Sequence, residues 1–466
     1  MGAMYERLSM EWWWATFART WAHSSTTLAY QNTLSALRSI LVAGLTTRLL
    51  YPFFGCLGPR LHIPLEYSSY LIERGQLELA VETIEQGKVL IWSEMFGLRS
   101  STRQLRRANP NLADRLAHFT QALEAINTPI SADQGGPDAF SPAFEELQRL
   151  LEGRQEVIQK IRALQGFANF MKANTFRTLQ FAAAQGPIII INHCHWRCDV
   201  LIVLHDSSPS LIPTNEGLYE RANTRNDSGV DSRQYEKELL QELGIPKQSR
   251  IWWYPTSVFC SLPLHAMGPR YFSDIYSRAS PKPDPQLSLL LVAQPDRSTP
   301  GVWGEMQAIQ SIRIPVTVLA VVENLPNHTL AHFACHGSLG AEVPLDAAIR
   351  LYGDDRLTLR DIANLRLPPA ELAFLSACHT AEPTDGDDPT EGLNIAAAMQ
   401  YHGFRSMADA DGRDISEPFY EHLLARGSES HDVPLGERSA RALRDAVRRL
   451  RKRKDITVGR WANWVH

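Results

Sequence analysis

The chain has 466 residues, too many for one ordinary hydrophobic core, and this length predicts two or three domains. Apolar residues make up 44% and charged residues 21%, the usual balance of a soluble globular protein. The net charge of −4 is small for this length, so nothing in the overall charge calls for a nucleic acid or an anionic membrane as partner.

Cysteine usage and the apolar segments indicate a cytoplasmic protein. The six cysteines are sparse and unevenly spaced, which predicts free thiols in a reducing compartment rather than a disulfide framework. The first ten residues contain Glu6 and Arg7 and lack the apolar core of a signal peptide. The most apolar stretch, residues 41–61, is interrupted by charged residues, proline and glycine, and is too broken to span a membrane.

Residues 1 to about 165 are predicted to form an all-α region. Within residues 65–98, apolar side chains recur at helical intervals on both sides of Gly75. The spacing from Gly75 to Ala80 resembles that of a tetratricopeptide helix pair, and a generic helical hairpin is the alternative. Residues 131–142 are rich in glycine and proline and predict a linker, which a further helix over residues 144–184 follows.

The character of the chain changes after Gly186. Ile188–Ile191 is a short, wholly apolar, β-branched run, which is typical of a central strand buried on both faces. Further strands are expected at residues 250–254, 287–293, 316–322, 331–334 and 371–376, and helices at 235–243, 393–401, 417–424 and 437–452. Such alternation predicts a parallel sheet covered by helices, with its chemistry at the carboxyl ends of the strands.

Two short motifs end predicted strands with a reactive side chain. The first runs from His332 to Gly337 (HFACHG) and the second from Leu372 to Ala381 (LAFLSACHTA), and Cys378 stands 42 positions after His336. Adjacent parallel strands that end together would bring the imidazole of His336 to the thiol of Cys378, a general base beside a nucleophile. The backbone N–H groups of Gly337 and Cys378 would then be available to hold an oxyanion.

These motifs and their surroundings resemble a CHAT domain, a branch of the caspase- and separase-like cysteine peptidases. The resemblance is greatest to fungal members, which carry tetratricopeptide-type helices upstream. The matching segments are residues 252–256, 260–266, 289–295, 332–337, 356–359, 375–381 and 391–396. The resemblance implies an α/β fold with a caspase-like, mostly parallel sheet flanked by helices over residues 175–466, preceded by an all-α, tetratricopeptide-like region over residues 1–165.

The resemblance also implies a mechanism for peptide hydrolysis. Cys378 would attack a peptide carbonyl as the thiolate, and His336 would take up its proton and pass it to the leaving amine. His332 lies inside its strand and is expected to be structural, and His379 is given no role. Neither a metal nor another cofactor is needed, and the expected partners are a protein or peptide substrate and a regulatory protein bound by the N-terminal helices.

Two further clusters offer candidates for substrate binding. Residues 192–199 (NHCHWRCD) hold four potential metal ligands on one turn, whereas structural zinc sites usually draw ligand pairs from separate loops, so no metal is expected. In a caspase-like fold this loop would help to bind the residue before the cleaved bond, through Arg197 and Asp199, and a salt-bridged loop is the alternative. The acidic run 382–388, with Asp385, would favour a basic substrate residue or be a solvated loop.

Two features near the C-terminus complete the predictions. The basic run 448–454 matches a nuclear or nucleic-acid signal, but it continues a predicted helix, and a solvated helix face is the favoured interpretation. After Gly403 a core strand of the family is expected to be missing, unless Phe404 to Met407 substitute for it. The chain is therefore predicted to be a cysteine endopeptidase in regulated proteolysis or signalling, with a catalytically impaired adaptor as the alternative and another Cys–His acyl-transfer enzyme as a third.

Overall fold

The structure is a computed structural model that divides into two compact units. It describes residues 2–47, 58–95, 104–125, 142–168, 170–171, 174–212, 251–257, 259, 288–294, 312–313, 318–338, 347–351, 355–365, 372–376, 395, 399, 405–408, 412–423 and 435–453. The first unit comprises Met1–Ala182, Asn192–Leu201 and Asp206–Pro213, and the second comprises Ala183–Ile191, Ile202–His205 and Thr214–His466.

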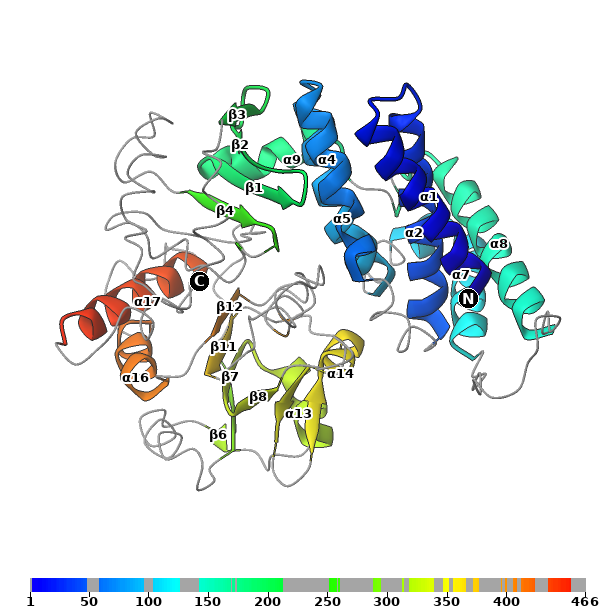
Figure 1. Ribbon diagram of the computed structural model, residues 1–466. Coiled ribbons are helices and arrows are strands. Elements are labelled where there is room, and N and C mark those ends of the chain that lie inside the picture. Colours follow the sequence, from blue (N-terminus) through cyan, green and yellow to red (C-terminus); the bar gives the residue numbers. More distant parts are fainter. Residues whose placement is uncertain are drawn as a thin grey trace. The chain divides into compact units, whose positions relative to one another are not determined.

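The first unit is built mainly from helices that pair along the chain (Figure 1). Its helices are α1 (Gly2–Thr20), α2 (Thr26–Thr47), η1 (Gly58–His62), α4 (Ile63–Glu73), α5 (Leu77–Met95), α7 (Pro110–Ala125), α8 (Pro142–Arg162) and α9 (Phe176–Gln180). α1 packs on α2, α4 on α5, and α7 on α8. The predicted helical N-terminal region is therefore confirmed. Among the described residues, none of the helices has both the length and the apolar character needed to cross a membrane.

The turn between α4 and α5 lies where the sequence predicts it. Gly75 has a φ of +70°, in the left-handed region that glycine adopts without strain. Ala80 on α5 is fully buried, and its carbonyl accepts a hydrogen bond from the Ser68 hydroxyl at 3.1 Å. The predicted helix pair is confirmed, and its likeness to a tetratricopeptide repeat stays a prediction.

The helix expected over residues 144–184 is wrong beyond Arg162. α8 ends there, Gly166 has a φ of +84°, and the chain re-enters a helix only at α9. The guanidinium of Arg162 donates to the carbonyl oxygens of Phe170 and Met171 at 2.8 and 3.1 Å, which ties the returning turn to the end of the helix. η2 (Phe181–Gln185) then leads to the first strand.

The second unit contains a five-stranded sheet whose pairs are all parallel. Its strands are β5 (Leu289–Ala293), β6 (Ile312–Arg313), β7 (Leu330–Ala334), β11 (Leu372–Ser376) and β12 (Arg405–Ala408), in the order β12-β11-β7-β5-β6. α16 (Gly412–Leu423) and α17 (Leu435–Arg451) bury their apolar residues against this sheet. The predicted fold class, a helical region followed by an α/β region with a parallel sheet flanked by helices, is confirmed.

His332 connects the centre of the sheet to α16. It is fully buried in β7, in register with Leu291 of β5 and Phe374 of β11. Its Nδ1 lies 3.1 Å from the hydroxyl of Tyr420, and its ring stacks on Phe374 with centroids 4.7 Å apart. His332 therefore lies in the core, as its position inside the strand predicts.

Two smaller sheets complete the described strands. β8 (His336–Ser338), β9 (Ala348–Arg350) and β10 (Arg356–Thr358) form an antiparallel sheet in the order β10-β9-β8. Thr358 then begins α14 (Leu359–Asn364) with a capping box that it shares with Asp361. β1 (Ile188–Cys194), β2 (Arg197–Val203), β3 (Ser210–Ile212) and β4 (Trp252–Pro255) form a sheet in the order β3-β2-β1-β4, in which β1 and β4 are parallel.

The strand predicted over residues 316–322 is wrong, because Val318–Asn324 forms the helix α13. Val321 and Leu325, four residues apart, are buried, whereas Glu323 between them is exposed. A strand would have put all three side chains on one face, whereas a helix puts only the first and last together. A short β-branched run does not by itself distinguish these two cases.

After Gly403, the structure agrees with the alternative that neighbouring residues substitute for the expected missing core strand. Arg405–Ala408 forms β12, which pairs in parallel with β11 from Leu372 to Leu375. Residues that were expected to substitute poorly therefore supply the neighbouring strand. The predicted linker, residues 131–142, lies outside the described residues except for Pro142, which begins α8, and the helix predicted at 235–243 lies outside them as well.

Candidate active site

The histidine motif and the cysteine motif follow adjacent strands that end together. β7 and β11 are parallel neighbours, and their last register pair joins Ala334 to Ser376 (Figure 1). Beyond that pair, the backbone N–H of Cys335 donates to the carbonyl oxygen of Ser376 at 3.4 Å. The two strands therefore stay hydrogen-bonded up to the points from which the motifs continue.

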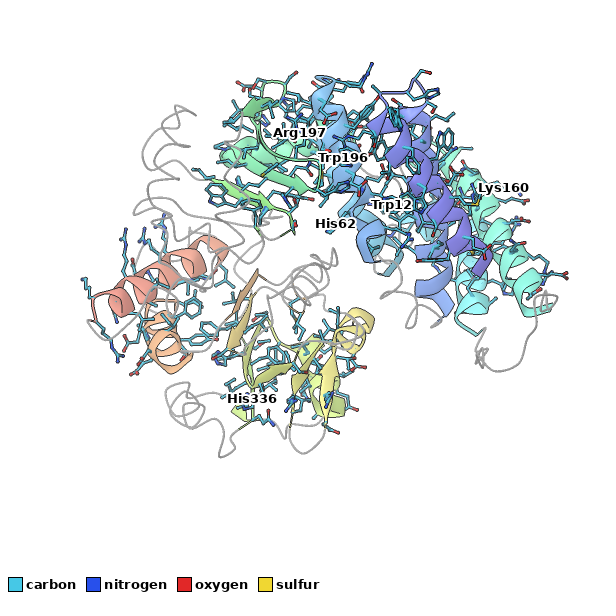
Figure 2. All side chains as sticks on the ribbon, in the orientation of Figure 1. Trp12, His62, Lys160, Trp196, Arg197 and His336 are labelled. Atoms are coloured by element: carbon cyan, nitrogen blue, oxygen red, sulfur yellow. The ribbon has the colours of Figure 1, made fainter. Side chains whose placement is uncertain are left out.

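His336 is half-buried at the start of β8 (Figure 2). It pairs with Arg350 of β9, and Gly337 pairs with Ile349, which is fully buried. The hydroxyl of Ser338 donates to the carbonyl of Ala348 at 3.2 Å. The antiparallel sheet thus fixes the backbone of the predicted base and of the predicted oxyanion donor.

Cys335 is a poor candidate for the nucleophile although it stands next to His336. Its side chain is 4% exposed, and its thiol donates to the carbonyl oxygen of Val292 at 3.5 Å. Cys378 and Asp385 lie outside the described residues, as do His379 and the acidic run 382–388. The structure therefore describes the part of the candidate site around His336, and the part around Cys378 lies outside the described residues.

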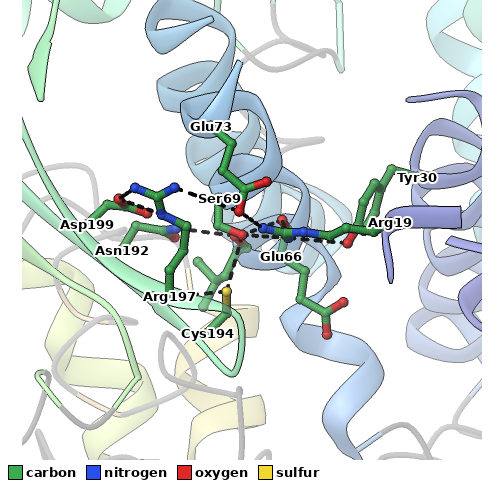
Figure 3. A network of polar contacts seen from close by, with 10 residues as sticks. Arg19, Tyr30, Glu66, Ser69, Glu73, Asn192, Cys194, Arg197 and Asp199 are labelled. Carbon is green, nitrogen blue, oxygen red and sulfur yellow. Dashed lines mark hydrogen bonds and ion pairs between the residues drawn. The ribbon is translucent and has the colours of Figure 1, made fainter. Parts of the chain in front are cut away.

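Arg197 and Asp199, the other predicted substrate contacts, bond to each other in β2. The guanidinium Nη2 and Nε of Arg197 lie 2.6 and 2.9 Å from Oδ1 of Asp199, and only 2% of the Asp199 side chain is exposed (Figure 3). Arg197 Nη1 also lies 3.7 Å from a carboxylate oxygen of Glu73 on α4. These contacts belong to the first compact unit and agree with the salt-bridged alternative.

Sequence reasoning missed the residue at the centre of this network, Arg19 of α1. Its guanidinium is buried, donates to the backbone carbonyl of Glu66 and to the hydroxyl of Ser69, both at 2.8 Å, and forms an ion pair with Glu73 (Figure 3). It also lies 4.5 Å from the ring centre of Trp196, in the turn between β1 and β2. The one available signal is a single basic residue after a tryptophan-rich, apolar run. Arg19 Nη1 also lies 3.4 Å from the hydroxyl of Tyr30. We give the name Arg19 cluster to Arg19 together with Tyr30, Glu66, Ser69, Glu73 and Trp196.

The potential metal ligands of residues 192–199 have protein partners instead. The Cys194 thiol donates to the Ser69 hydroxyl at 3.3 Å, and Asn192 donates to the carbonyl of Leu65 at 3.2 Å. Burial raises the pKa of the Cys194 thiol, which disfavours the thiolate that a metal would need. The tip of the β1–β2 hairpin is therefore bonded to α4.

Glu66 is a buried carboxyl within the Arg19 cluster, and 1% of it is exposed. Burial raises its pKa to about 7, although the indole groups of Trp12 and Trp196 and the charge of Arg19 favour the ionised form. His195 Nδ1 lies 3.6 Å from Oε1 of Glu66. The folded chain thus holds a proton on Glu66 at pH values where an unfolded chain has released it.

Glu66 predicts a measurable pH dependence of stability. Its folded pKa lies above its unfolded value, so its contribution is fully present below about pH 4.5 and is lost as the pH rises through about 7. Glu66→Gln should abolish this slope, so the variant gains stability relative to the wild type by up to about 3 kcal/mol between pH 5 and pH 8. Urea unfolding of both proteins across this range measures it. If the free energies of unfolding of the two proteins changed in parallel between pH 5 and pH 8, Glu66 would not titrate in this range.

The basic run near the C-terminus is paired with acidic residues of α16. Arg449 Nη1 lies 3.1 Å from Glu421 Oε2, and Arg453 Nη1 lies 2.7 Å from Asp414 Oδ2. These contacts agree with a solvated helix face and give no reason to add a nucleic acid to the expected partners.

The C-terminal part of the chain matches a known family. The family model described as the CHAT domain matches residues 263–466. The match includes β5 to β12 and the positions of His336, Gly337 and Cys378, whereas Arg197, Asp199 and the N-terminal helices lie before it. None of the curated proteins matches this chain.

Proposed function

Because residues 263–466 of this chain form a CHAT domain, a peptidase-related domain of the caspase-like class, we propose that the chain is a cysteine endopeptidase. His336 is its general base, Cys378 its nucleophile, and a protein or peptide its substrate. One observation carries the proposal: the 42-residue offset between His336 and Cys378 is also the register offset between β7 and β11.

The register supports the pairing in the following way. Every described pair between these strands, from Leu330–Leu372 to Ala334–Ser376, joins residues 42 positions apart. His336 and Cys378 each stand two positions beyond the last pair, and neighbouring strands lie about 4.8 Å apart. We therefore expect the side chains of His336 and Cys378 to come within the reach that a nucleophile and its base require.

The chemistry needs no metal or other cofactor. The Cys378 sulfur attacks the peptide carbonyl carbon, and His336 takes up the thiol proton and delivers it to the leaving amine as the C–N bond breaks. The N–H groups of Gly337 and Cys378 stabilise the oxyanion, worth about 3–4 kcal/mol for one donor in other hydrolases. Water, deprotonated by His336, then hydrolyses the thioester.

The adaptor alternative rested on a missing core strand, and the presence of β12 argues against that reason. Arg405–Ala408 forms β12 beside β11, so the sheet continues past the strand that leads to Cys378. We retain the proposed division into a helical region, residues 1–165, and a peptidase region, residues 175–466. The helical region is proposed to receive a regulatory protein, and Arg197, Asp199 and Asp385 remain proposed substrate contacts. The described cysteines, Cys194, Cys198 and Cys335, form no disulfide, which supports a cytoplasmic setting.

A thiol-reactive peptide probe tests the proposal. The wild-type chain should be labelled, whereas Cys378→Ala and His336→Ala should lose the label, because the first removes the sulfur and the second the base that activates it. Cys335→Ala is the matched control, since it removes a buried thiol beside the same histidine and should leave labelling intact. Equal labelling of Cys378→Ala and wild type would refute the assignment of the nucleophile.

A further inference from the structure

One face of α1 is apolar and open to solvent. Trp21 is 78% exposed, Met10 72%, Phe17 55% and Trp13 50%, and these residues recur every three or four positions. Trp14, 37% exposed, lies beside them. Residues with this spacing share one side of a helix. We call Met10, Trp13, Trp14, Phe17 and Trp21 the α1 stripe.

The opposite face of α1 is already used by the first unit. Leu8 and Ala15 are fully buried there, and Arg19 makes the contacts of the Arg19 cluster. A helix that is apolar on all sides is normally covered on all sides. The stripe exposes about 600 Å² of apolar surface, judged from the size of such side chains, which is as much as the largest patch of an ordinary monomer.

The rings of the stripe are held in place before anything binds. Trp13 and Phe17 stack with centroids 5.5 Å apart and 23° between their planes, and Trp12 packs on Trp13 at 5.0 Å. The indole N–H of Trp14 donates to the Ser25 hydroxyl at 3.1 Å. Side chains that are already ordered lose little entropy on association, so this surface suits binding.

We propose that two copies of this chain associate through the α1 stripe, with their α1 helices packed antiparallel about a twofold axis. Two stripes together bury about 1,200 Å², the lower end of the range for specific interfaces. The five stripe residues carry no charge that would select a different partner, and an apolar surface is complementary to its own copy across a twofold axis.

The charges at the ends of the stripe favour the antiparallel arrangement. Glu6 and Arg7 are exposed one turn before Met10. Parallel helices would bring these residues together with their own copies, like charge against like charge. Antiparallel helices instead keep the Glu6 and Arg7 residues of the two copies at opposite ends of the interface, and the helix dipoles are opposed as well.

A membrane surface is the less favoured occupant of the stripe. Helices that lie in a membrane interface usually carry several lysines or arginines on their polar face. The basic residues of α1 are Arg7, which pairs with Glu11 at 3.9 Å, and Arg19, which is buried.

The mass in solution tests the proposal. Between about 1 and 100 µM, where an interface of this size dissociates, light scattering should show the wild-type mass double, and Phe17→Glu should stay at the mass of one copy. Phe181→Glu is the matched control, because Phe181 is 66% exposed on η2 outside the stripe and its variant should still double in mass. Circular dichroism must show equal helix content in all three. The proposal is overturned if the wild type keeps the mass of one copy, whether or not it binds phosphatidylcholine vesicles. It is also overturned if Phe17→Glu doubles in mass.

A pair of cysteine variants tests the antiparallel geometry. Met10 and Trp21 stand at opposite ends of the stripe, about 16 Å apart along the helix. A mixture of Met10→Cys and Trp21→Cys should form a disulfide-linked dimer, whereas neither variant should do so alone, and the wild-type chain controls for the native cysteines. Efficient cross-linking of Trp21→Cys with itself would show that the helices are parallel and contradict the proposal.

Discussion

Replacing Arg19 with methionine should lower the free energy of unfolding by about 3–5 kcal/mol, because it removes two hydrogen bonds from a buried charged group, each worth about 1.5–3 kcal/mol. The substitution keeps the length of the side chain but removes the guanidinium that donates to the Glu66 carbonyl and to Ser69. It also removes the cation from the face of Trp196. Urea unfolding followed by circular dichroism at neutral pH measures the loss.

Arg7→Met is the control for this change, because Arg7 lies on the same helix with 64% of its side chain exposed. It should cost less than about 0.5 kcal/mol, as exposed ion pairs contribute little. Equal effects of the two substitutions would mean that the Arg19 cluster does not hold the β1–β2 hairpin to the helices.

Replacing Cys378 with alanine should lower kcat/KM for a peptide substrate by at least about 10⁴-fold, or about 5 kcal/mol of transition-state stabilisation. His336→Ala should cause a loss of similar size, because a thiol without its base attacks slowly. The double variant should lose no more than Cys378→Ala alone, since residues that act as a unit are not additive.

Kinetics of the three variants on one substrate give this comparison directly. Cys335→Ala again serves as the control and should keep most of the activity, because its thiol is bonded to Val292 inside the core. Losses that multiply in the double variant would show that His336 and Cys378 act independently, and would contradict a shared mechanism.

The strands that carry the candidate site could be predicted, because short, wholly apolar runs of this kind are suited to the buried interior of a sheet. Leu289–Ala293, Leu330–Ala334 and Leu372–Ser376 are short, apolar runs, and the structure makes them adjacent parallel strands. Strands of this kind are typical of a parallel sheet that is buried on both faces. The register between β7 and β11 was not predicted, although its offset of 42 positions equals the separation of His336 and Cys378.

The errors fall where local sequence leaves two outcomes open. The β-branched run at residues 316–322 suited a strand, but contacts of Val321 and Leu325 with the core favour a helix. Arg405–Ala408 was expected at best to substitute for a missing family strand, and it pairs with β11 at the edge of the sheet. Arg19 could not be recognised, because its partners come from α4 and the hairpin, about 50 to 180 residues away in the sequence.

The central claim, that His336 and Cys378 lie side by side, is tested most directly by a disulfide. In His336→Cys, mild oxidation should join position 336 to Cys378, because such a bond forms when the Cα atoms are about 4.4–6.8 Å apart. Mass spectrometry of the digested protein should find the two peptides linked, and should find no such link in Ser338→Cys, two positions further along β8. The absence of the link in His336→Cys, or an equal link in Ser338→Cys, would contradict the proposed active site.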